Sequence, residues 1–150
     1  MPTGGKLVAA IVFGALAYFI SDLIKPLLVD TRGTELDWFS RWNGLIGVLM
    51  GWQIIGKTAG KSYRTAFGMG LTTLAATVFW CLVLWSAWEM IQKSMRRSYG
   101  GAVEAVQDMT QIFVEYAVFV FAARQDIIIA AVIGALFCAW VTEFFGKRWT

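Results

Sequence analysis

The sequence predicts an all-α integral membrane protein, a helical bundle of four transmembrane helices with one amphipathic helix at the membrane interface. The chain of 150 residues is 58% apolar and only 15% charged, whereas a soluble domain carries about 25% charged residues. Its apolar residues form long runs separated by short charged stretches, as in helices that cross a bilayer. The lipid bilayer is therefore the first expected partner.

Four apolar runs are the expected spans, at residues 7–24, 38–55, 66–90 and 127–145. A helix rises about 1.5 Å per residue, so the longer runs reach or exceed the roughly 30 Å of a bilayer core. The first run closes at Asp22, Lys25 and Pro26 and lacks a signal-peptide cleavage site, so we expect it to be retained. The second run is the weakest because Arg41 and Asn43 interrupt its start.

Tryptophan side chains mark several of the expected helix ends, since indole rings favour the headgroup layer. Three others, Trp80, Trp85 and Trp140, lie deeper in their runs and are expected to pack between helices. The tryptophans near helix ends are Trp38, Trp42, Trp52, Trp88 and Trp149.

Four spans place both termini on the same side of the membrane. Lysines and arginines divide almost equally between the two sides. The loop after the second span holds Lys57, Lys61 and Arg64 with no acid among them. We expect this basic loop to face lipid headgroups on the cytoplasmic side, which makes the N- and C-termini cytoplasmic.

Residues 102–123 differ from the four runs because acidic and polar side chains recur there at spacings of four, three and four. Such spacings place them on one face of a helix, with apolar residues largely opposite. An acid near the centre of a lipid-facing span costs roughly 2.5–3.5 kcal/mol on insertion scales, which favours a helix lying at the interface. The alternative is a fifth span whose acids turn into the bundle. This acidic stripe consists of Glu104, Asp108, Gln111 and Glu115.

The stretch GWQIIGKT at 51–58 matches the nucleotide-binding pattern G-x-x-x-x-G-K-[ST]. That pattern requires a buried strand before it and a helix after it, and the sequence predicts no such strand. Gly44, Gly47 and Gly51 recur on one helix face, and we expect them to pack against a neighbouring helix. We therefore expect no nucleotide as a partner. The scattered basic clusters form no broad basic face, so no nucleic acid is expected either.

Residue sets for catalysis or metal binding are sparse. The absence of histidine excludes histidine-ligated metals and imidazole acid–base catalysis. Cys81 and Cys138 lie inside apolar runs, at similar expected depths in the bilayer. Packed together, they form a candidate thiol pair for soft, thiol-reactive species; packed apart, they are ordinary small apolar side chains. No cofactor and no metal is expected.

Three of the expected spans end with an acid followed by a base one helical turn later. These spacings allow an ion pair at the membrane surface, with the base extending toward water. Interfacial anchoring is the simpler interpretation, and a role in an ion or proton route is the alternative. The pairs are Asp22 with Lys25, Glu89 with Lys93, and Glu143 with Lys147.

Several short motifs follow one another along nearly the whole chain: MPTGGKLVAA, SDLIKPL, NGLIGVLMGW, the run from GLTTL through VFW to EM, VEAV with its later EY, and TEFFGKRW. This set resembles the bacterial TrgA family, small membrane proteins associated with tellurium (tellurite) resistance. The resemblance implies a protein of the bacterial inner membrane. It carries no catalytic signature and implies no site residues.

We therefore expect a non-enzymatic membrane protein that contributes to tellurite resistance by limiting oxyanion entry, assisting efflux or protecting membrane thiols. One alternative is a structural or assembly subunit of a larger membrane complex, docked through the glycine face and the acidic stripe. Another is a small transporter or channel that works by self-association. An enzyme is the least expected class because the sequence shows no nucleophile–base pair and no metal-ligand set.

Overall fold

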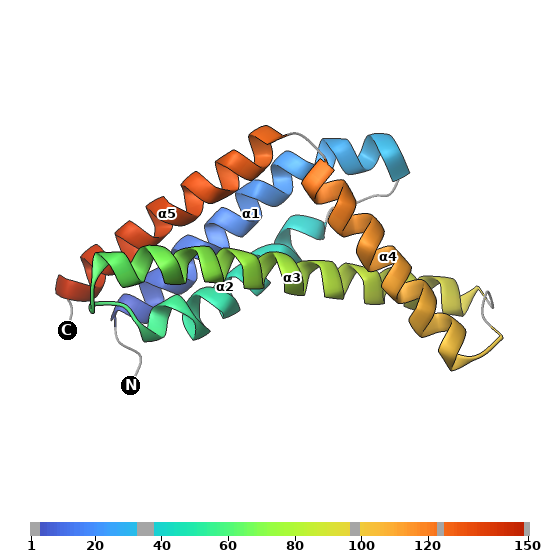
Figure 1. Ribbon diagram of the computed structural model, residues 1–150, viewed down its shortest axis with the longest axis horizontal. Coiled ribbons are helices and arrows are strands. Elements are labelled where there is room, and N and C mark those ends of the chain that lie inside the picture. The colour runs from blue at the N-terminus through green and yellow to red at the C-terminus, as the bar shows by residue number, and fades with distance from the viewer. Residues whose placement is uncertain (1–3, 33–37, 97–99, 123–124, 149–150) are drawn as a thin grey trace. The chain divides into compact units, whose positions relative to one another are not determined.

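Figure 1 shows the computed structural model, which describes residues 4–32, 38–96, 100–122 and 125–148. These residues form helices joined by short connections, and no strand occurs among them. The chain divides into two compact units, Met1–Thr77 with Asp126–Thr150 (unit 1) and Val78–Gln125 (unit 2). The elements are α1 (Gly4–Arg32), α2 (Phe39–Gln53), the 3₁₀ turn η1 (Ile55–Lys57), α3 (Tyr63–Met95), α4 (Ala102–Ala122) and α5 (Gln125–Arg148).

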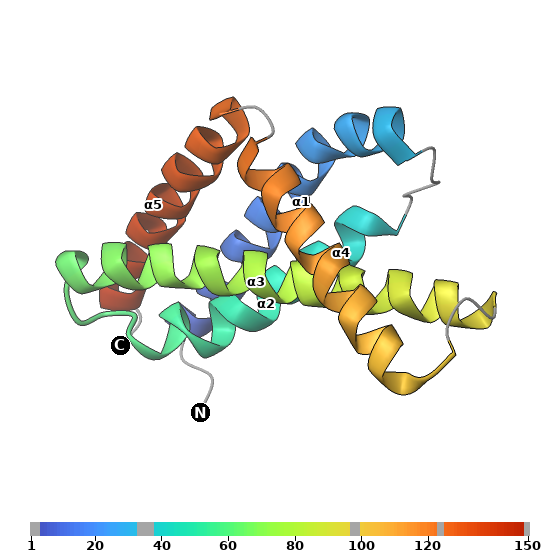
Figure 2. The ribbon, with the colours of Figure 1, turned by 45° about the vertical axis from the view of Figure 1, so that its right-hand side comes forward.

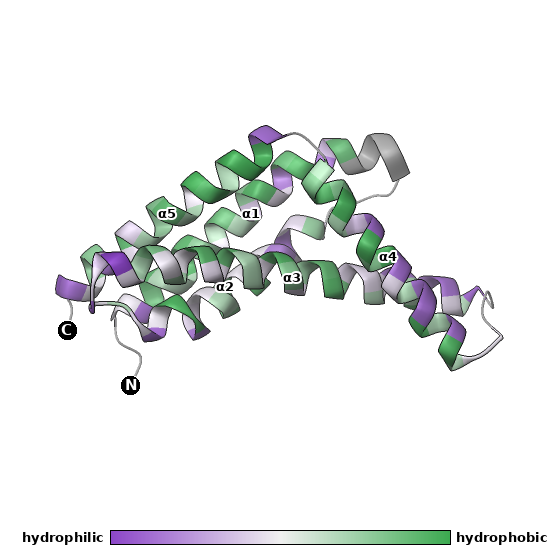
Figure 3. Cartoon of the chain, viewed as in Figure 1, coloured by the Kyte–Doolittle hydropathy of each residue, from purple (hydrophilic) through white to green (hydrophobic). Residues whose placement is uncertain are grey.

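The all-α prediction is confirmed for this part of the chain. Three helical segments are long and apolar enough to cross a membrane, namely Gly4–Leu27, Tyr63–Met95 and Gln125–Arg148. They contain the spans expected at 7–24, 66–90 and 127–145. In Figure 3 the middle of α5 is green, for hydrophobic residues, and its two ends are purple, for hydrophilic ones.

The second expected span, 38–55, corresponds to α2 and the turn that follows it. α2 has 15 residues, so its length is about 22 Å, which is short of a bilayer core of roughly 30 Å. The remaining apolar residues enter η1, where the backbone leaves the α-helical path. Three helices therefore have spanning length, and α2 is a shorter helix of unit 1.

The helix α1 continues through Pro26 to Arg32, while its candidate membrane-spanning segment ends at Leu27, close to where the first run was expected to close. A proline inside a helix lacks the N–H that would bond the carbonyl four residues earlier, here that of Asp22. α1 continues past this position, and the side chains of Asp22 and Lys25 pair in the same turn at 3.0 Å. The headgroup position expected for Trp149 lies outside the described residues.

Within unit 1, α2 runs antiparallel to α1, the helix that precedes it in the chain. A Cβ atom built on Gly51 of α2 would lie 2.6 Å from the carbonyl oxygen of Ala9, and one built on Gly47 would lie 2.6 Å from that of Phe13. α5 runs back along α1 in the same way, with Gly146 beside Gly5 (3.1 Å to a built Cβ). Figure 2 shows the start of α1 and the end of α5 gathered near the connection from α2 to α3.

The interior of unit 1 contains mainly small and polar side chains with a few large ones, such as Phe13 and Ile55, while most large apolar side chains face outward. Its core cluster is Ala9, Phe13, Ile55, Ala135, Cys138 and Ala139. Outward-facing side chains include Ile11 (60% exposed) and Ile133 (61%). Buried hydroxyls turn back onto their own helices, as where Thr73 Oγ1 donates to the carbonyl of Met69 at 2.7 Å. This distribution inverts that of a soluble protein and suits a lipid surrounding.

Among the described residues, six tryptophans have exposed side chains, more than the sequence predicted. Trp38, Trp42, Trp52 and Trp88, which were expected near helix ends, are all exposed, as a position among lipid headgroups requires. The expectation that Trp80 and Trp140 pack between helices is wrong, since they are 50% and 46% exposed. In unit 1 the closest helix contacts are made by glycine and alanine, because a large ring would hold the backbones apart.

Unit 2 consists of the second part of α3 packed against α4. Phe79 of α3 meets Phe113 of α4 edge-to-face, with ring centroids 5.9 Å apart. Ile112 is buried beside this contact at 2% exposure. The helix expected at 102–123 is confirmed as α4. Its outward face carries the exposed apolar side chains Val103, Val106, Val114, Val118 and Phe121.

Candidate functional site

The glycine face of α2 is the closest helix contact of unit 1. Gly44, Gly47 and Gly51 are buried, and the backbone of α1 lies directly against them. A Cβ on Gly51 would also lie 2.9 Å from Cβ of Phe13, closer than side-chain atoms approach in proteins. The prediction of packing glycines is confirmed. Gly51, the first glycine of the P-loop-like pattern, lies inside a helix and serves this contact.

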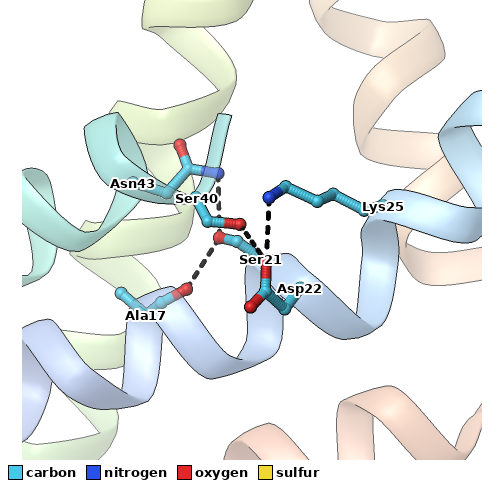
Figure 4. Close-up of polar contacts among 6 residues, drawn as sticks. All are labelled: Ala17, Ser21, Asp22, Lys25, Ser40 and Asn43. Atoms are coloured by element: carbon cyan, nitrogen blue, oxygen red, sulfur yellow. Dashed lines mark hydrogen bonds and ion pairs between the residues drawn. The ribbon is translucent and has the colours of Figure 1, made fainter. Parts of the chain in front are cut away.

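A polar network continues the α1–α2 contact toward the end of α1 (Figure 4). Asn43 Nδ2 donates to Ser21 Oγ at 2.9 Å, and Ser21 Oγ donates to the carbonyl of Ala17 at 2.7 Å. Ser40 Oγ donates to Asp22 Oδ1 at 2.6 Å. Ser21, Ser40 and Asn43 are at most 4% exposed. Because buried polar groups bond one another across the two helices, this α1–α2 network fixes their register.

The ion pair expected between Asp22 and Lys25 is confirmed as part of this network. Lys25 Nζ lies 3.0 Å from Asp22 Oδ1, the same oxygen that accepts the hydrogen bond from Ser40. Both side chains remain partly exposed, at 28% for Lys25 and 44% for Asp22. The pair therefore lies where the buried network meets the surface of unit 1, which suits interfacial anchoring.

The Asn43–Ser21 bond gives a direct test of the network. In a double-mutant cycle of Ser21→Ala and Asn43→Ala, we expect a coupling free energy of about 0.6 kcal/mol, the typical value between membrane helices. The measurement is unfolding in detergent micelles. A matched cycle of Thr73→Ala with Asn43→Ala should be additive, since Thr73 bonds its own helix. Equal coupling in both cycles would contradict a role for the bond.

A second polar group lies at the opposite end of unit 1, where α5 closes on the connection between η1 and α3. Glu143 is 0% exposed, and its Oε2 accepts a hydrogen bond of 2.8 Å from the backbone N–H of Gly60. Gly60 has φ 88°, a left-handed conformation that favours glycine. Lys147 Nζ lies 3.7 Å from Glu143 Oε1. The carboxylate thus ties α5 to a connection 83 residues earlier in the chain.

One carboxylate oxygen of Glu143, Oε1, is buried without a hydrogen-bond partner among the described residues. The same holds for the neighbouring Thr142 Oγ1. Lys147 compensates the carboxylate charge from the surface and also lies over the ring of Tyr63, 4.0 Å from its centroid. The expected pair of Glu143 and Lys147 is therefore present. Glu143 is a buried acid that links α5 to the connection before α3, and its partner base, Lys147, reaches the surface.

Six basic residues lie at this same end of unit 1 and form what we call the basic end. The antiparallel order brings together the start of α1, η1, the start of α3 and the end of α5. The expected loop residues Lys57, Lys61 and Arg64 are all exposed. The basic end consists of Lys6, Lys57, Lys61, Arg64, Lys147 and Arg148.

The residues of the acidic stripe of α4 differ in their surroundings: one is paired with α3, and the other three are exposed. Asp108 Oδ2 pairs with Lys93 Nζ of α3 at 3.0 Å, whereas Gln111 and Glu115 are exposed. Glu104 is also exposed and accepts the N–H of Gly100 at 2.8 Å. The stripe is therefore no single acidic surface, because the face of α4 that carries Asp108 packs against α3.

The acid and base expected to pair near the end of the third span both bond α4. Lys93 holds Asp108, and Glu89 Oε2 accepts a hydrogen bond of 2.8 Å from Tyr116 Oη. These bonds fasten the two helices of unit 2 through polar groups between them. The sequence spacing of Glu89 and Lys93 suggested a contact within one helix, and it could not show that α4 supplies partners for both.

The two cysteines have different surroundings, and both are free thiols. Cys138 is buried in unit 1, where its Sγ lies 3.6 Å from the carbonyl oxygen of Val12. Cys81 is half-buried on the part of α3 that belongs to unit 2. Cys138 therefore acts as a small packing side chain between α5 and α1.

Sequence reasoning identified the glycine face but missed the α1–α2 network and the burial of Glu143. Ser40 and Asn43 stand one turn before Gly44 and Gly47, so the small-residue face could have been extended to them. Glu143 gave no such signal, because its partner is the backbone of Gly60. Among the described residues, no group of three or more Cys, Asp or Glu side chains could hold a metal ion.

Comparisons with models of protein families, with curated proteins and with solved structures give no match. The function of this chain is therefore inferred from its own sequence and contacts.

Proposed function

We propose that this chain is an integral protein of the bacterial inner membrane that contributes to tellurite resistance without catalysing a reaction. The membrane part rests on one observation, the inverted side-chain distribution of unit 1. Phe19 (58% exposed) and Phe137 (61%) face outward, while Ser40 and Glu143 are fully buried. Lipid is the surrounding in which this arrangement is stable. The link to tellurite rests on the resemblance to the TrgA family.

The distribution of basic residues supports an orientation with both termini in the cytoplasm. Within the described part of unit 1, the basic end carries six lysines and arginines, and the opposite end carries three, Lys25, Arg32 and Arg41. Cytoplasmic flanks of membrane helices are enriched in such residues. On this orientation α2 returns the chain to the cytoplasmic side as a short fourth membrane helix, and α4 lies at the interface.

Of the three mechanisms for resistance, protection by a thiol pair has the least support. Cys138 is 4% exposed and packed against α1, so a reagent in the membrane reaches it only if the helices separate. Limiting oxyanion entry or assisting efflux requires no reactive thiol. We therefore expect the resistance role to survive replacement of both cysteines.

Growth of a deletion strain on graded tellurite tests the proposed function. Deletion should lower the tolerated tellurite concentration, and wild-type protein should restore it. The double variant Cys81→Ser/Cys138→Ser should restore it as well when its membrane level matches the wild type. Unchanged tolerance after deletion would overturn the resistance role. Failure of the double variant alone would restore the thiol mechanism.

A second function, as a subunit of a larger membrane complex, is favoured by α4. Its outward face combines exposed apolar side chains, such as Val106 and Phe121, with the exposed acids Glu104 and Glu115 at its flank. A helix of this kind suits an amphipathic partner helix with basic flanks. Purification in mild detergent separates the two functions, since a stoichiometric partner that is lost with Phe121→Asp would favour the subunit.

A further inference from the structure

The basic end of unit 1 has a large unbalanced positive charge. Among the described residues of unit 1, Glu143 is the one acid at this end, and it is fully buried with Oε2 held by Gly60. It therefore offsets one of six positive charges, mainly that of Lys147 at 3.7 Å. Lys57, Lys61, Arg64 and Arg148 remain exposed. A surface with this charge attracts anionic partners.

A stripe of exposed aromatic side chains on α5 ends beside the basic end of unit 1. Phe137, Trp140 and Phe144 recur at helical spacing and are 61%, 46% and 36% exposed. Trp140 stacks on Phe144 with ring centroids 5.8 Å apart. The guanidinium of Arg148 lies over the ring of Phe144, 5.1 Å from its centroid. A continuous surface thus begins with cationic groups and continues as apolar rings along one helix.

The cationic part of this surface is held in place by backbone contacts. A Cβ atom built on Gly146 would lie 2.7 Å from the backbone N of Gly60 and 3.1 Å from the carbonyl carbon of Ala59. Lys61 follows Gly60 and Lys147 follows Gly146, so the two lysines extend from neighbouring points of the contact between Gly60 and Gly146. The Glu143 bond fastens the same contact. The backbone positions from which these two cations extend are therefore fixed before an anion binds, which lowers the cost of ordering the site.

We propose that the basic end and the α5 stripe bind an anionic phospholipid, with its phosphate at Lys61 and Arg148 and an acyl chain along Phe144 and Trp140. The inference rests on the membrane insertion in the proposed function and is independent of tellurite resistance. Arginine suits a phosphate because its planar guanidinium donates two parallel hydrogen bonds. Exposed aromatic rings beside the charges favour a molecule with an acyl chain over free phosphate.

Titration of phosphatidylglycerol into the protein purified in a neutral detergent tests the site, with the thermal unfolding midpoint as the readout. Phosphatidylglycerol should raise the midpoint of the wild type. Phosphatidylcholine and glycerol 3-phosphate at the same concentration should not, because the first lacks net charge and the second lacks acyl chains. Lys61→Gln/Arg148→Gln should weaken the apparent affinity by roughly 30-fold, and each single change by roughly fivefold.

Two matched controls make the test specific. Lys25→Gln/Arg41→Gln removes the same charge from the opposite end of unit 1 and should keep the wild-type affinity. Trp140→Ala should weaken binding, whereas Trp42→Ala, which removes a ring of nearly equal exposure (47% against 46%), should not.

The proposal is overturned if phosphatidylglycerol does not shift the wild-type midpoint. It is equally overturned if glycerol 3-phosphate shifts it as much, or if the opposite-end double variant loses the same affinity. Should the double variant at the basic end fail to fold, the single changes decide, since each retains one cation. Tellurite tolerance is measured in cells, so failure of that function leaves the lipid result standing, and the reverse holds too.

Discussion

Gly51→Ala is expected to destabilise the protein by about 1–3 kcal/mol, the range for inserting atoms into a packed contact. The new Cβ would lie 2.6 Å from the carbonyl oxygen of Ala9 and 2.9 Å from Cβ of Phe13. The first is a backbone atom, so no side-chain rotation relieves the clash. α1 and α2 must move apart, and Gly51→Val should separate them further and prevent stable folding.

Gly68 of α3 provides the matched control for this change. Nothing lies within 4 Å of a Cβ built there. Alanine is the better helix former by about 0.8–1.0 kcal/mol in water, so Gly68→Ala should be neutral or slightly stabilising. Detergent unfolding followed by circular dichroism measures both variants. Similar losses at Gly51 and Gly68 would show that the close α1–α2 contact does not determine stability.

The opposite signs expected at Gly51 and Gly68 also show how far the sequence could predict the fold. Both are helical glycines within apolar runs, and the spacing of Gly44, Gly47 and Gly51 identified one of them as a contact residue. The identity of the facing residues, Ala9 and Phe13, requires knowledge of the register between α1 and α2. That register depends on the α1–α2 network, whose members stand far apart in the sequence, as with Asn43 and Ser21.

Helix positions were predictable because long apolar runs have few alternatives to helices. The bounds of α2 were harder, since hydropathy alone does not register that the backbone turns at Ile55. The partners of polar side chains were the least predictable feature. Lys93 bonds Asp108 of α4, although the sequence placed an acid, Glu89, one turn away on its own helix. Local spacing shows which contacts are possible within a helix, and it does not show the partners that a neighbouring helix supplies.

Removal of the Glu143 carboxylate is the second change with a large expected effect. Glu143→Ala leaves the N–H of Gly60 without its acceptor, 2.8 Å away in the wild type. A donor that loses its partner costs about 1–3 kcal/mol where it is buried, and this contact is partly buried; the cavity left by the fully buried Glu143 side chain adds to the loss. We expect Glu143→Ala to lose at least this much in detergent unfolding and to expose the Gly60 amide to hydrogen exchange.

Glu104 gives an internal control because it makes the same kind of bond at the surface. Its Oε2 accepts the N–H of Gly100 at 2.8 Å, but both residues are exposed, so water replaces the carboxylate when it is removed. Glu104→Ala should therefore change stability by no more than about 0.5 kcal/mol. A loss equal to that of Glu143→Ala would show that burial does not set the strength of the Glu143 bond.

Glu143→Gln separates the hydrogen bond from the charge. Glutamine keeps a carbonyl oxygen that can accept the Gly60 N–H, and it removes the charge that Lys147 compensates at 3.7 Å. If the acceptor matters most, Gln should retain most of the stability that Ala loses, since a neutral amide is also cheaper to bury than a carboxylate. Equal losses for Gln and Ala would instead assign the stabilisation to the ion pair. The structure favours the first result, because Gly60 is within hydrogen-bond distance of Glu143 and Lys147 is not.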